Sequence, residues 1–433
     1  SSTMAEVLMP ALLEAFALNE GYVVTRESES VHRFTYHLSE PDTQQRLATF
    51  DFLASNADEG FADLLADEAD IAMSLREIRP REAQLGYEAG LGDMEDANRS
   101  RVLSLDGMVP VVSVGNPVSS LSLNQLAHVF AGKISNWNDL GGPDAPITLH
   151  LLTAQSGFAQ AVEDQLMEPS KMSLADAVVR HDRNLAMVSA VERDPFAIGI
   201  ASYAETGNTK HLTLTGQCGF SLAASRRTIK TEDYPINAPM FLYFPARRLP
   251  KLARDFLSYT RSPSAQIVIR RAGFVDQTAE EIAINHQGDR FANAIASAGK
   301  EVSLDAIQGM VGTLSGMKRL STSFRFQTGS IKLDAQSRSN VQQLARALEA
   351  GRYDARSLYF VGFSDGEGPA TGNLQIAEKR ANVVKEAVLS AAETANPDRI
   401  DLQVHAFGEA MPMACDDSAW GRQVNRRVEV WVK

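Results

Sequence analysis

The chain has 433 residues, of which 44% are apolar and 22% charged, and its formal net charge is −12. At roughly 150 residues per domain, this length predicts two or three compact units of ordinary globular composition. The acidic balance argues against nucleic acid or an anionic membrane as a partner, and no run approaches the ~20 apolar residues of a membrane-spanning helix.

The first two thirds of the chain alternate between helix and strand patterns. An apolar helical run extends from Met4 to Ala17, and Pro10 predicts either a kink or a helix that is regular only after this residue. Further along, Ser122 is expected to cap a helix. The remaining predictions are strands at 46–54, 70–74, 109–114, 147–152 and 196–201, and helices at 123–130 and 158–166. This alternation favours an α/β domain over a sandwich.

The last third of the chain divides into a helical stretch and a compact unit. From about Asp276 to Leu320 the strand patterns stop, and Ser303 caps a helix, so we expect a helical connector. In the unit that follows, Asp334 caps a helix that ends at Gly351. A long helix at 374–392 and strands at 358–363, 402–407 and 427–432 complete the unit.

Two cysteines, Cys218 and Cys415, fit neither a disulfide scaffold nor a metal cluster. Their separation means that a bridge would have to link two domains, and two unpaired thiols are the alternative. The motifs H-E-x-x-H and C-x-x-C are absent, and the closely spaced His32 and His37 lie on a polar segment. We therefore expect no enzyme activity, no cofactor and no metal site.

The long C-terminal helix carries a charged residue on its apolar face. Arg380 lies four residues from both Ile376 and Val384, and a guanidinium there must be paired or solvated through a cleft. Asp365 is expected just after a strand, at the edge of a sheet, and Asn373 at the helix N-cap. These groups could together bind a zwitterion. Alternatively, Asp365 pairs with Arg380, and Asn373 is only a cap.

Motifs between residues 321 and 433 resemble those of the OmpA-like peptidoglycan-binding domains. They are, in order, Phe326–Leu333 (an F-x-x-x-S-x-x-L strand), Phe363-Ser364-Asp365, Asn373, Arg380-Ala381, Phe407-Gly408-Glu409 with Pro412, and Asn425-Arg426-Arg427-Val428-Glu429. The resemblance implies a small α/β sandwich of the order βαβαβ-β, which binds diaminopimelate in the peptidoglycan stem peptide.

By that resemblance, Asp365 holds the ammonium group of diaminopimelate and Arg380 its carboxylate, with Asn373 assisting. Ser364 keeps the hydroxyl of the family's usual threonine, whereas Phe363 replaces its usual histidine. Arg426 and Arg427 stay open, since one is a candidate to support the site and the other a candidate for a solvated charge.

Three strand-to-helix junctions in the first part of the chain offer hydroxyl and backbone N–H groups to an anion. They contain Ser2 and Thr3, Ser74 and Arg76, and Ser156 and Gly157. The alternative for each junction is an ordinary N-cap, and Arg76 could instead be a structural partner of a nearby acid.

The order of segments over about residues 1–275 resembles the phosphate-binding proteins of the periplasmic binding protein superfamily. The resemblance rests on Asp70–Ile78 (family D-I-G-x-S-S-R-x-I), Leu105-Asp106-Gly107, Asn116-Pro117 and Phe130–Trp137. It implies a two-lobed α/β fold that closes on phosphate or another small anion in the interlobe cleft. Lobe 1 would comprise 1–105 and 205–275, lobe 2 would comprise 106–204, and a connector at 276–320 would lead to the domain at 321–433.

The family's anion loop reads R-x-x-S-G-T-R, but Thr153–Ala159 lacks both arginines and the threonine, which predicts weaker phosphate binding or another ligand. The sequence thus predicts a non-enzymatic periplasmic protein of the Gram-negative envelope, associated with an ABC transporter, the outer membrane and peptidoglycan. The first residue, Ser1, is compatible with prior removal of a start or signal segment. The alternative is a wall-anchored interaction or structural module whose N-terminal domain has lost or changed its small ligand.

Overall fold

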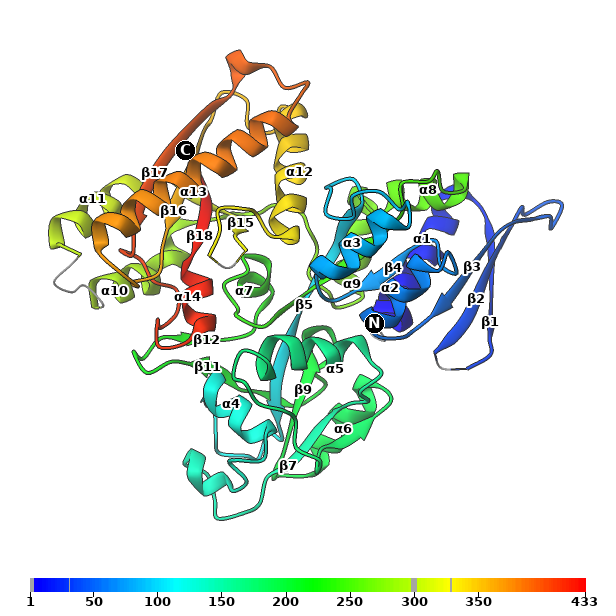
Figure 1. Ribbon diagram of the computed structural model, residues 1–433, viewed down its shortest axis with the longest axis horizontal. Helices are drawn as coiled ribbons and strands as arrows, with labels where there is room; N and C mark the ends of the chain where they lie inside the picture. Colours follow the sequence, from blue (N-terminus) through cyan, green and yellow to red (C-terminus); the bar gives the residue numbers. More distant parts are fainter. Residues whose placement is uncertain (1–3, 31, 297–301, 328) are drawn as a thin grey trace. The chain divides into compact units, whose positions relative to one another are not determined.

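The computed structural model, shown in Figure 1, describes residues 4–30, 32–296, 302–327 and 329–433. The chain forms two compact units, one from Ser1–Thr213 and Ile236–Gln277, the other from Leu214–Pro235 and Thr278–Lys433. The chain passes for the last time from the first unit to the second between Gln277 and Thr278, near the expected boundary at residue 275. The structure differs from the expected division in two respects, because the 214–235 segment and nearly all of the expected connector at 276–320 belong to the C-terminal unit.

The first unit is built on a mixed sheet in the order β4-β13-β5-β9-β7-β8, with β10 paired to β5. Strand β7 is parallel to β8 and β9, whereas β13 is antiparallel to β4 and β5, and β5 is antiparallel to β9. The bounds are β4 Ala72–Ser74, β5 Ser100–Val112, β7 Thr148–Leu152, β8 Val179–His181, β9 Ala197–Ser202, β10 Lys210–His211 and β13 Asn237–Tyr243.

A separate antiparallel sheet, β1-β2-β3, and a set of helices complete this unit. The strands of this sheet are β1 Val23–Ser28, β2 Arg33–Ser39 and β3 Arg46–Leu53, and the short strand β6 Ser120–Ser122 lies outside it. The helices are α1 Met9–Glu20, α2 Ala57–Leu65, α3 Pro80–Glu88, α4 Leu123–Phe130, α5 Gly157–Val162, α6 Asn184–Arg193, α8 Lys251–Tyr259 and α9 Pro263–Arg271. Single turns lie at η1 Met4–Leu8, η2 Trp137–Leu140, η3 Glu163–Met167 and η4 Tyr203–Glu205.

Several local predictions are confirmed in this unit. The Ser122 side chain caps α4 by accepting from the Gln125 N–H at 3.0 Å. Pro10 occupies the first turn of α1, and the π-helical turn η1 precedes this helix, so that the expected helical run becomes regular only close to Pro10.

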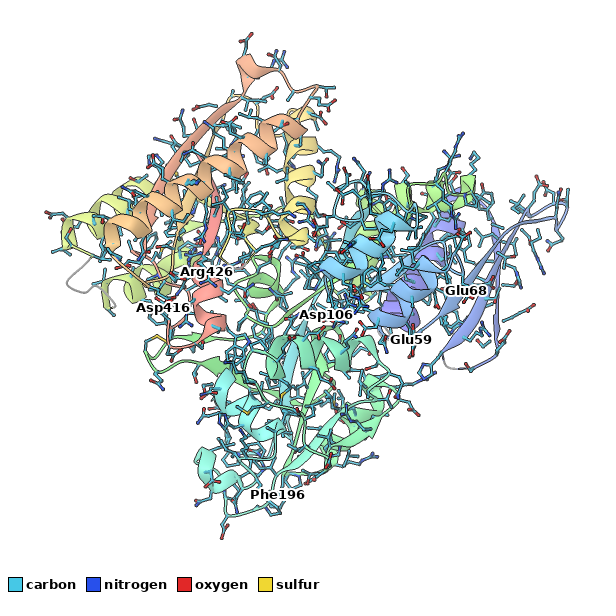
Figure 2. The ribbon with its side chains drawn as sticks, viewed as in Figure 1. Glu59, Glu68, Asp106, Phe196, Asp416 and Arg426 are labelled. Atoms are coloured by element: carbon cyan, nitrogen blue, oxygen red, sulfur yellow. A yellow bond between two sulfur atoms is a disulfide. The ribbon has the colours of Figure 1, made fainter. Side chains whose placement is uncertain are left out.

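Strand β5 is the longest strand of the sheet and changes partner halfway along. Gly107 pairs with Asn237 of β13, and Met108 pairs with Ser202 of β9. At this change of partner, the buried Asp106 (labelled in Figure 2) accepts a hydrogen bond from the Ser202 hydroxyl at 2.5 Å and from the Gly107 N–H at 2.8 Å. Burial raises the pKa of Asp106 to about 6. Asp106 thus links β5 to the end of β9.

The second unit is built on a sheet in the order β14-β15-β18-β16-β17, in which β16 and β17 are parallel and the other neighbours antiparallel. Its strands are β14 Glu281–Ile282, β15 Lys318–Arg325, β16 Ser357–Phe363, β17 Asp401–Gly408 and β18 Arg427–Val432. Its helices are α10 Gly288–Ala296, α11 Leu304–Leu314, α12 Ala335–Glu349, α13 Ala370–Ala391 and α14 Ala419–Asn425, with turns η5 Ile284–Gln287 and η6 Pro397–Arg399.

This order contains the predicted βαβαβ-β series, and Ser303 and Asp334 cap α11 and α12 as expected. The expected strand at Phe326–Leu333 is absent among the residues described there. Strand β15 ends at Arg325, and the chain turns back so that Phe326 and Leu333 form a single bridge.

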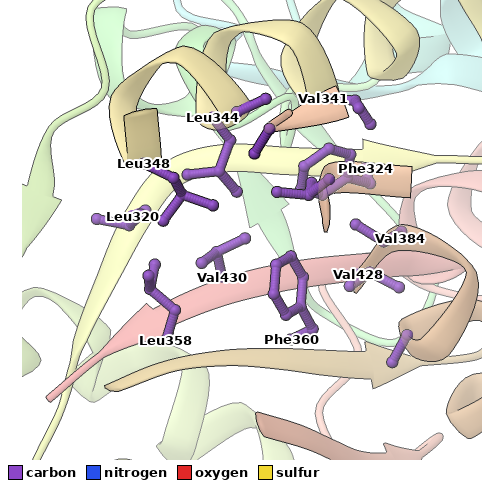
Figure 3. Packing of buried hydrophobic residues seen from close by; sticks show 14 of the residues in the cluster. Leu320, Phe324, Val341, Leu344, Leu348, Leu358, Phe360, Val384, Val428 and Val430 are labelled. Carbon is purple, nitrogen blue, oxygen red and sulfur yellow. The ribbon is translucent and has the colours of Figure 1, made fainter. Parts of the chain in front are cut away.

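Helices cover both faces of this sheet. On one face, Leu344 of α12 and Val384 of α13 pack against Phe360 and Val430, as Figure 3 shows. Side chains alternate along a strand, so Trp431 points to the opposite face and packs with α10 and α11. The expected connector helix is therefore part of the domain core.

The 214–235 segment contributes β11 (Thr213–Thr215), β12 (Ser221–Leu222) and α7 (Arg226–Lys230). Cys218 and Cys415 form a disulfide with a Cα–Cα distance of 5.6 Å, which decides between the two alternatives. Both cysteines belong to the C-terminal unit, so the bridge does not link two units as the sequence suggested.

Two acidic residues of this segment are buried beside arginines of the sheet. Asp233 accepts two hydrogen bonds from Arg319, at 2.7 and 3.0 Å, and the Glu232 carbonyl accepts one from Arg325 at 2.7 Å. Desolvation would raise the pKa of Asp233, but the Arg319 guanidinium outweighs it and lowers the pKa. Burial raises the pKa of Glu232 to about 8. The segment thus supplies one counter-charge, Asp233, and one backbone acceptor to the arginines of the C-terminal unit.

Candidate functional site

The register of the C-terminal sheet brings Asp365 and Arg426 together. Phe363, at the end of β16, pairs with Arg427, at the start of β18, so that both neighbouring loops leave the same edge of the sheet. Asp365 accepts a hydrogen bond from Arg426 Nη1 at 2.7 Å. Of the two arginines left open by the sequence, Arg426 therefore contacts the candidate site.

Arg427 is a structural residue and not the solvated charge that the sequence allowed. It is fully buried, its guanidinium lies 4.2 Å from the Phe363 ring centroid, and Nε donates to Glu429 at 2.7 Å. Desolvation would raise the pKa of Glu429, but the surrounding arginines outweigh it and hold the pKa well below its usual range.

Arg380 lies on the buried face of α13, together with Ala377 and Val384, as the helical spacing predicted. It is 6% exposed, and its Nε has no hydrogen-bond partner within the described chain. Its guanidinium lies 5.2 Å from the ring centroid of Phe326, within the range of a cation–π contact. Asp365 does not satisfy this cation by a direct ion pair, because it pairs with Arg426 instead.

The electrostatic surroundings of Arg380 favour the binding of an anion. Desolvation and the nearby charge of Arg426 lower its pKa, and only Asp365 acts in the opposite direction. A buried guanidinium with an unused N–H is costly unless a partner arrives, and a carboxylate matches its geometry.

Two polar side chains complete the neighbourhood. Ser364 is 2% exposed, and its hydroxyl has no partner among the described residues. Asn373 is not the N-cap that the sequence predicted, because α13 begins at Ala370 directly after Pro369. The Asn373 side chain instead donates to Glu409 at 2.6 Å, which ties the first turn of α13 to the loop after β17.

Sequence reasoning missed Asp416 as a neighbour of this site. Its carboxylate accepts from the Gly366 N–H and from the Asn425 side chain, each at 2.8 Å. Figure 2 labels Asp416 and Arg426 in the C-terminal unit. The family motifs at Gly408-Glu409 and Asn425–Arg427 lie on either side of this loop, but neither of them includes Asp416.

In the first unit, Arg76 is already neutralised by acidic side chains. Glu82 accepts two hydrogen bonds from it, at 2.8 and 2.6 Å, Asp58 accepts another, and Asp164 lies 3.9 Å from Nε. Desolvation would lower the pKa of Arg76, but Glu82 and Asp58 outweigh it and raise the pKa. The interpretation of Arg76 as a structural partner of an acid is therefore the one that the geometry supports.

The other predicted anion ligands act as local caps or cannot be placed. The Ser74 hydroxyl donates to the Arg76 carbonyl at 2.7 Å, and Ser156 accepts from the Ala159 N–H at 3.0 Å as the N-cap of α5. Gly157 is the buried first residue of that helix. Ser2 and Thr3 lie outside the described residues.

The acids around Arg76 also hold segments of this unit together. Arg79 contacts Asp58 at 2.9 Å and Asp164 at 3.2 Å, and the Ala57 N–H donates to Gln160 at 3.0 Å. Three carboxylates and two guanidinium groups carry a net negative charge, which opposes an added phosphate. Over the described residues, no group of three metal-ligating side chains is present, and no helix has the length and apolarity to cross a bilayer.

Comparison with known proteins assigns each part of the chain to a family of binding proteins. Residues 34–264 match the PBP superfamily domain, and residues 325–426 match the OmpA family. The phosphate-binding protein PstS of Staphylococcus haemolyticus is 25% identical over 210 residues, or 46% of this chain and 64% of that protein. Protein SphX of Synechococcus elongatus is 24% identical over 228 residues, or 50% and 65%. The chain thus spans less than two thirds of either relative.

Among solved structures, an ABC-type phosphate transport receptor from Vibrio cholerae is 23% identical with a TM-score of 0.42, covering 51% of this chain and 84% of that one. The peptidoglycan-associated lipoprotein from Burkholderia pseudomallei is 22% identical with a TM-score of 0.23, covering 26% and 89%. Because residues 34–264 are more than half of the chain, this protein belongs to the PBP superfamily, and it carries a C-terminal OmpA-family domain.

Proposed function

We propose that this chain is a non-enzymatic protein of the periplasm that attaches non-covalently to peptidoglycan through its C-terminal domain. The observation that carries the proposal is the buried Arg380, whose Nε is unpartnered close to the Asp365–Arg426 pair. A free amino-acid end, such as that of diaminopimelate in a stem peptide, supplies both charges that these residues can pair. The OmpA-family match agrees with this ligand class.

In this proposal, the ligand ammonium group binds Asp365, and the ligand carboxylate accepts hydrogen bonds from Arg380. Ser364 and Asn373 line the same site and orient the ligand. Each charge-assisted hydrogen bond contributes roughly 1.5–3 kcal/mol, because a buried donor that lacked a partner gains one. Arg426 donates a hydrogen bond to Asp365 and so fixes its orientation before the ligand arrives.

The test is co-sedimentation of the full chain with purified peptidoglycan sacculi. Asp365→Ala and Arg380→Ala should abolish pelleting, because each removes one of the two charges that bind the ligand. Lys379→Ala is the matched control, since this exposed cation is the neighbour of Arg380 on α13 and should pellet normally. Unchanged pelleting of Asp365→Ala would overturn the site assignment.

For the PBP unit, we propose capture of a small anion, with phosphate as the first candidate, in a cleft between the two expected lobes. The superfamily match and the phosphate-binding relatives support this proposal. Delivery to an ABC transporter and an association with the outer membrane belong to the same proposal. The neutralised Arg76 favours the alternative, in which this unit has lost or changed its small ligand and serves as an interaction module.

Calorimetric titration of phosphate distinguishes anion capture from the interaction module. The full chain must be used, because a 1–275 fragment would contain the 214–235 segment without the rest of its unit. Saturable heat that is lost in Arg76→Ala and kept in Arg81→Ala, an exposed cation on α3, would support anion capture. No heat from the folded protein would favour the interaction module and leave the peptidoglycan proposal intact.

A further inference from the structure

The Cys218–Cys415 disulfide is attached to the loop that supports the Asp365 site. We propose that Asp416 is a positioning residue for stem-peptide binding and that the disulfide holds it in place, so that reduction by a dithiol weakens the grip on peptidoglycan. This inference rests on the proposed peptidoglycan site.

Asp416 joins the two loops from which the Asp365–Arg426 pair is built. One carboxylate oxygen accepts from the Gly366 N–H, next to Asp365, and the other accepts from the Asn425 side chain, next to Arg426, each at 2.8 Å. A single side chain therefore ties the loop of Asp365 to the loop of Arg426, the residue that orients Asp365. Gly366 permits the close approach, because a Cβ there would lie 2.9 Å from the Asp416 carboxylate.

The loop that carries Asp416 lies outside the sheet and is held by several hydrogen bonds. Asn425 accepts from the Met413 N–H at 2.7 Å, and Arg422 donates to the Asp416 carbonyl at 2.9 Å. These two anchors come from α14, a helix of two turns. The covalent anchor is Cys415, whose partner lies on the 214–235 segment.

The β11–β12 hairpin packs against this loop. Gln217 N–H donates to Asp417 at 2.7 Å, and Cys218 N–H donates to Cys415 Sγ at 3.1 Å. Gly216 leaves the room that Cys415 occupies, since a Cβ at that position would collide with its sulfur. The bridge is therefore one part of a contact that holds both sides of Asp416.

The two sulfurs differ in solvent exposure, which decides the sulfur that a reductant attacks first. Cys415 is buried, whereas Cys218 lies in the exposed turn of the hairpin. A thiolate of the dithiol attacks Cys218 Sγ, the S–S bond breaks, and Cys415 leaves with the electron pair as a thiolate. The second thiolate of the reductant then releases Cys218, so the dithiol becomes a disulfide and two electrons and two protons pass to the two cysteines.

After reduction, only hydrogen bonds hold the loop, and the Asp365–Arg426 spacing is no longer fixed before the ligand arrives. A loss of preorganisation at the lower end of the contribution of one charge-assisted hydrogen bond weakens binding by about tenfold. The positioning role predicts this change in Kd for protein that remains folded.

The experiment is calorimetric titration of a stem tripeptide ending in diaminopimelate into the full-length chain. The oxidised protein is compared with protein reduced by dithiothreitol, with reoxidised protein, with Cys218→Ser/Cys415→Ser and with Asp416→Ala. Leu348→Ala is the control, because it destabilises the core of the same unit away from these loops. Thermal unfolding of every sample shows which are folded at the titration temperature.

We expect about tenfold weaker binding for the reduced, double-serine and Asp416→Ala forms, recovery on reoxidation, and an unchanged Kd for Leu348→Ala. Equal Kd values for oxidised and reduced protein, or an unchanged Kd for Asp416→Ala, would overturn the inference while the proposed function stands. No binding by the oxidised chain would instead overturn the proposed function itself. If the double-serine variant does not fold, reversible reduction of the wild-type protein decides the question.

Discussion

Replacing Glu232 by glutamine should change the pH dependence of the stability of the C-terminal unit. Burial raises the pKa of Glu232 from 4.5 to about 8, so at neutral pH the carboxyl is protonated in the folded chain and ionised in the unfolded chain. The folded state thus binds more protons than the unfolded state. Stability is therefore highest below about pH 4.5 and falls as the pH rises to about 8, with no further loss above that value.

Each pH unit in this window corresponds to at most about 1.4 kcal/mol, so the loss between pH 5 and pH 7 is about 2–3 kcal/mol. Glu232→Gln removes this loss, because an amide does not titrate and its oxygen can still accept the hydrogen bond that Asn340 donates at 3.1 Å. The stability of the variant relative to wild type should therefore rise by about 2–3 kcal/mol from pH 5 to pH 7.

The assay is guanidinium unfolding followed by tryptophan fluorescence in a Trp137→Phe background, so that Trp420 and the buried Trp431 report on the C-terminal unit. Glu378→Gln, at an exposed position on α13, is the matched control, and it should change the free energy of unfolding by the same amount at both pH values. A Glu232→Gln difference that does not depend on pH would refute the reasoning, because the carboxyl would then be equally protonated in both states.

Three further predictions follow from the charged groups of the two units. Asp233→Asn leaves the buried Arg319 guanidinium with only Glu429, which it shares with Arg290 and Arg427, and should destabilise the C-terminal unit by about 3–5 kcal/mol; a loss below ~1 kcal/mol in the same unfolding assay would contradict this. Arg380→Met removes an incompletely paired buried cation, so the free energy of unfolding should rise by on the order of 1 kcal/mol while pelleting with sacculi is lost; lower stability would count against an unsatisfied guanidinium. Glu82→Gln releases one charge from Arg76 and should strengthen phosphate binding about tenfold in calorimetry, whereas unchanged heats would exclude Arg76 as an anion ligand.

Local signals in the sequence predicted local structure well. Ser122, Ser303 and Asp334 cap their helices as expected, because a cap depends on residues three positions apart. The same reasoning failed at Asn373, since Pro369 provided an earlier start for α13. The buried face of Arg380 was also predictable, because helical spacing alone places it beside Val384.

Partners distant in sequence were not predictable from spacing. Asp365 had two arginines within reach, and the pairing of β16 with β18 selects Arg426 over Arg380. For Arg76 the sequence left both an anion and a nearby acid open as the partner, and the fold selects Glu82, six residues along the chain, together with Asp58 from another segment. The 214–235 segment carries no motif of the C-terminal family, so its membership of that unit rests on contacts that appear only in the fold.

The three crossings of the chain between its units also set an order of completion during synthesis. The 214–235 segment is made before Arg319, so Asp233 stays hydrated until its counter-charge, 86 residues later, has been synthesised. A chain cut short before residue 415 would keep Cys218 as a free thiol on an exposed hairpin. Loss of the C-terminal end thus leaves a reactive thiol 197 residues earlier in the chain, where a thiol-specific labelling reagent can detect it.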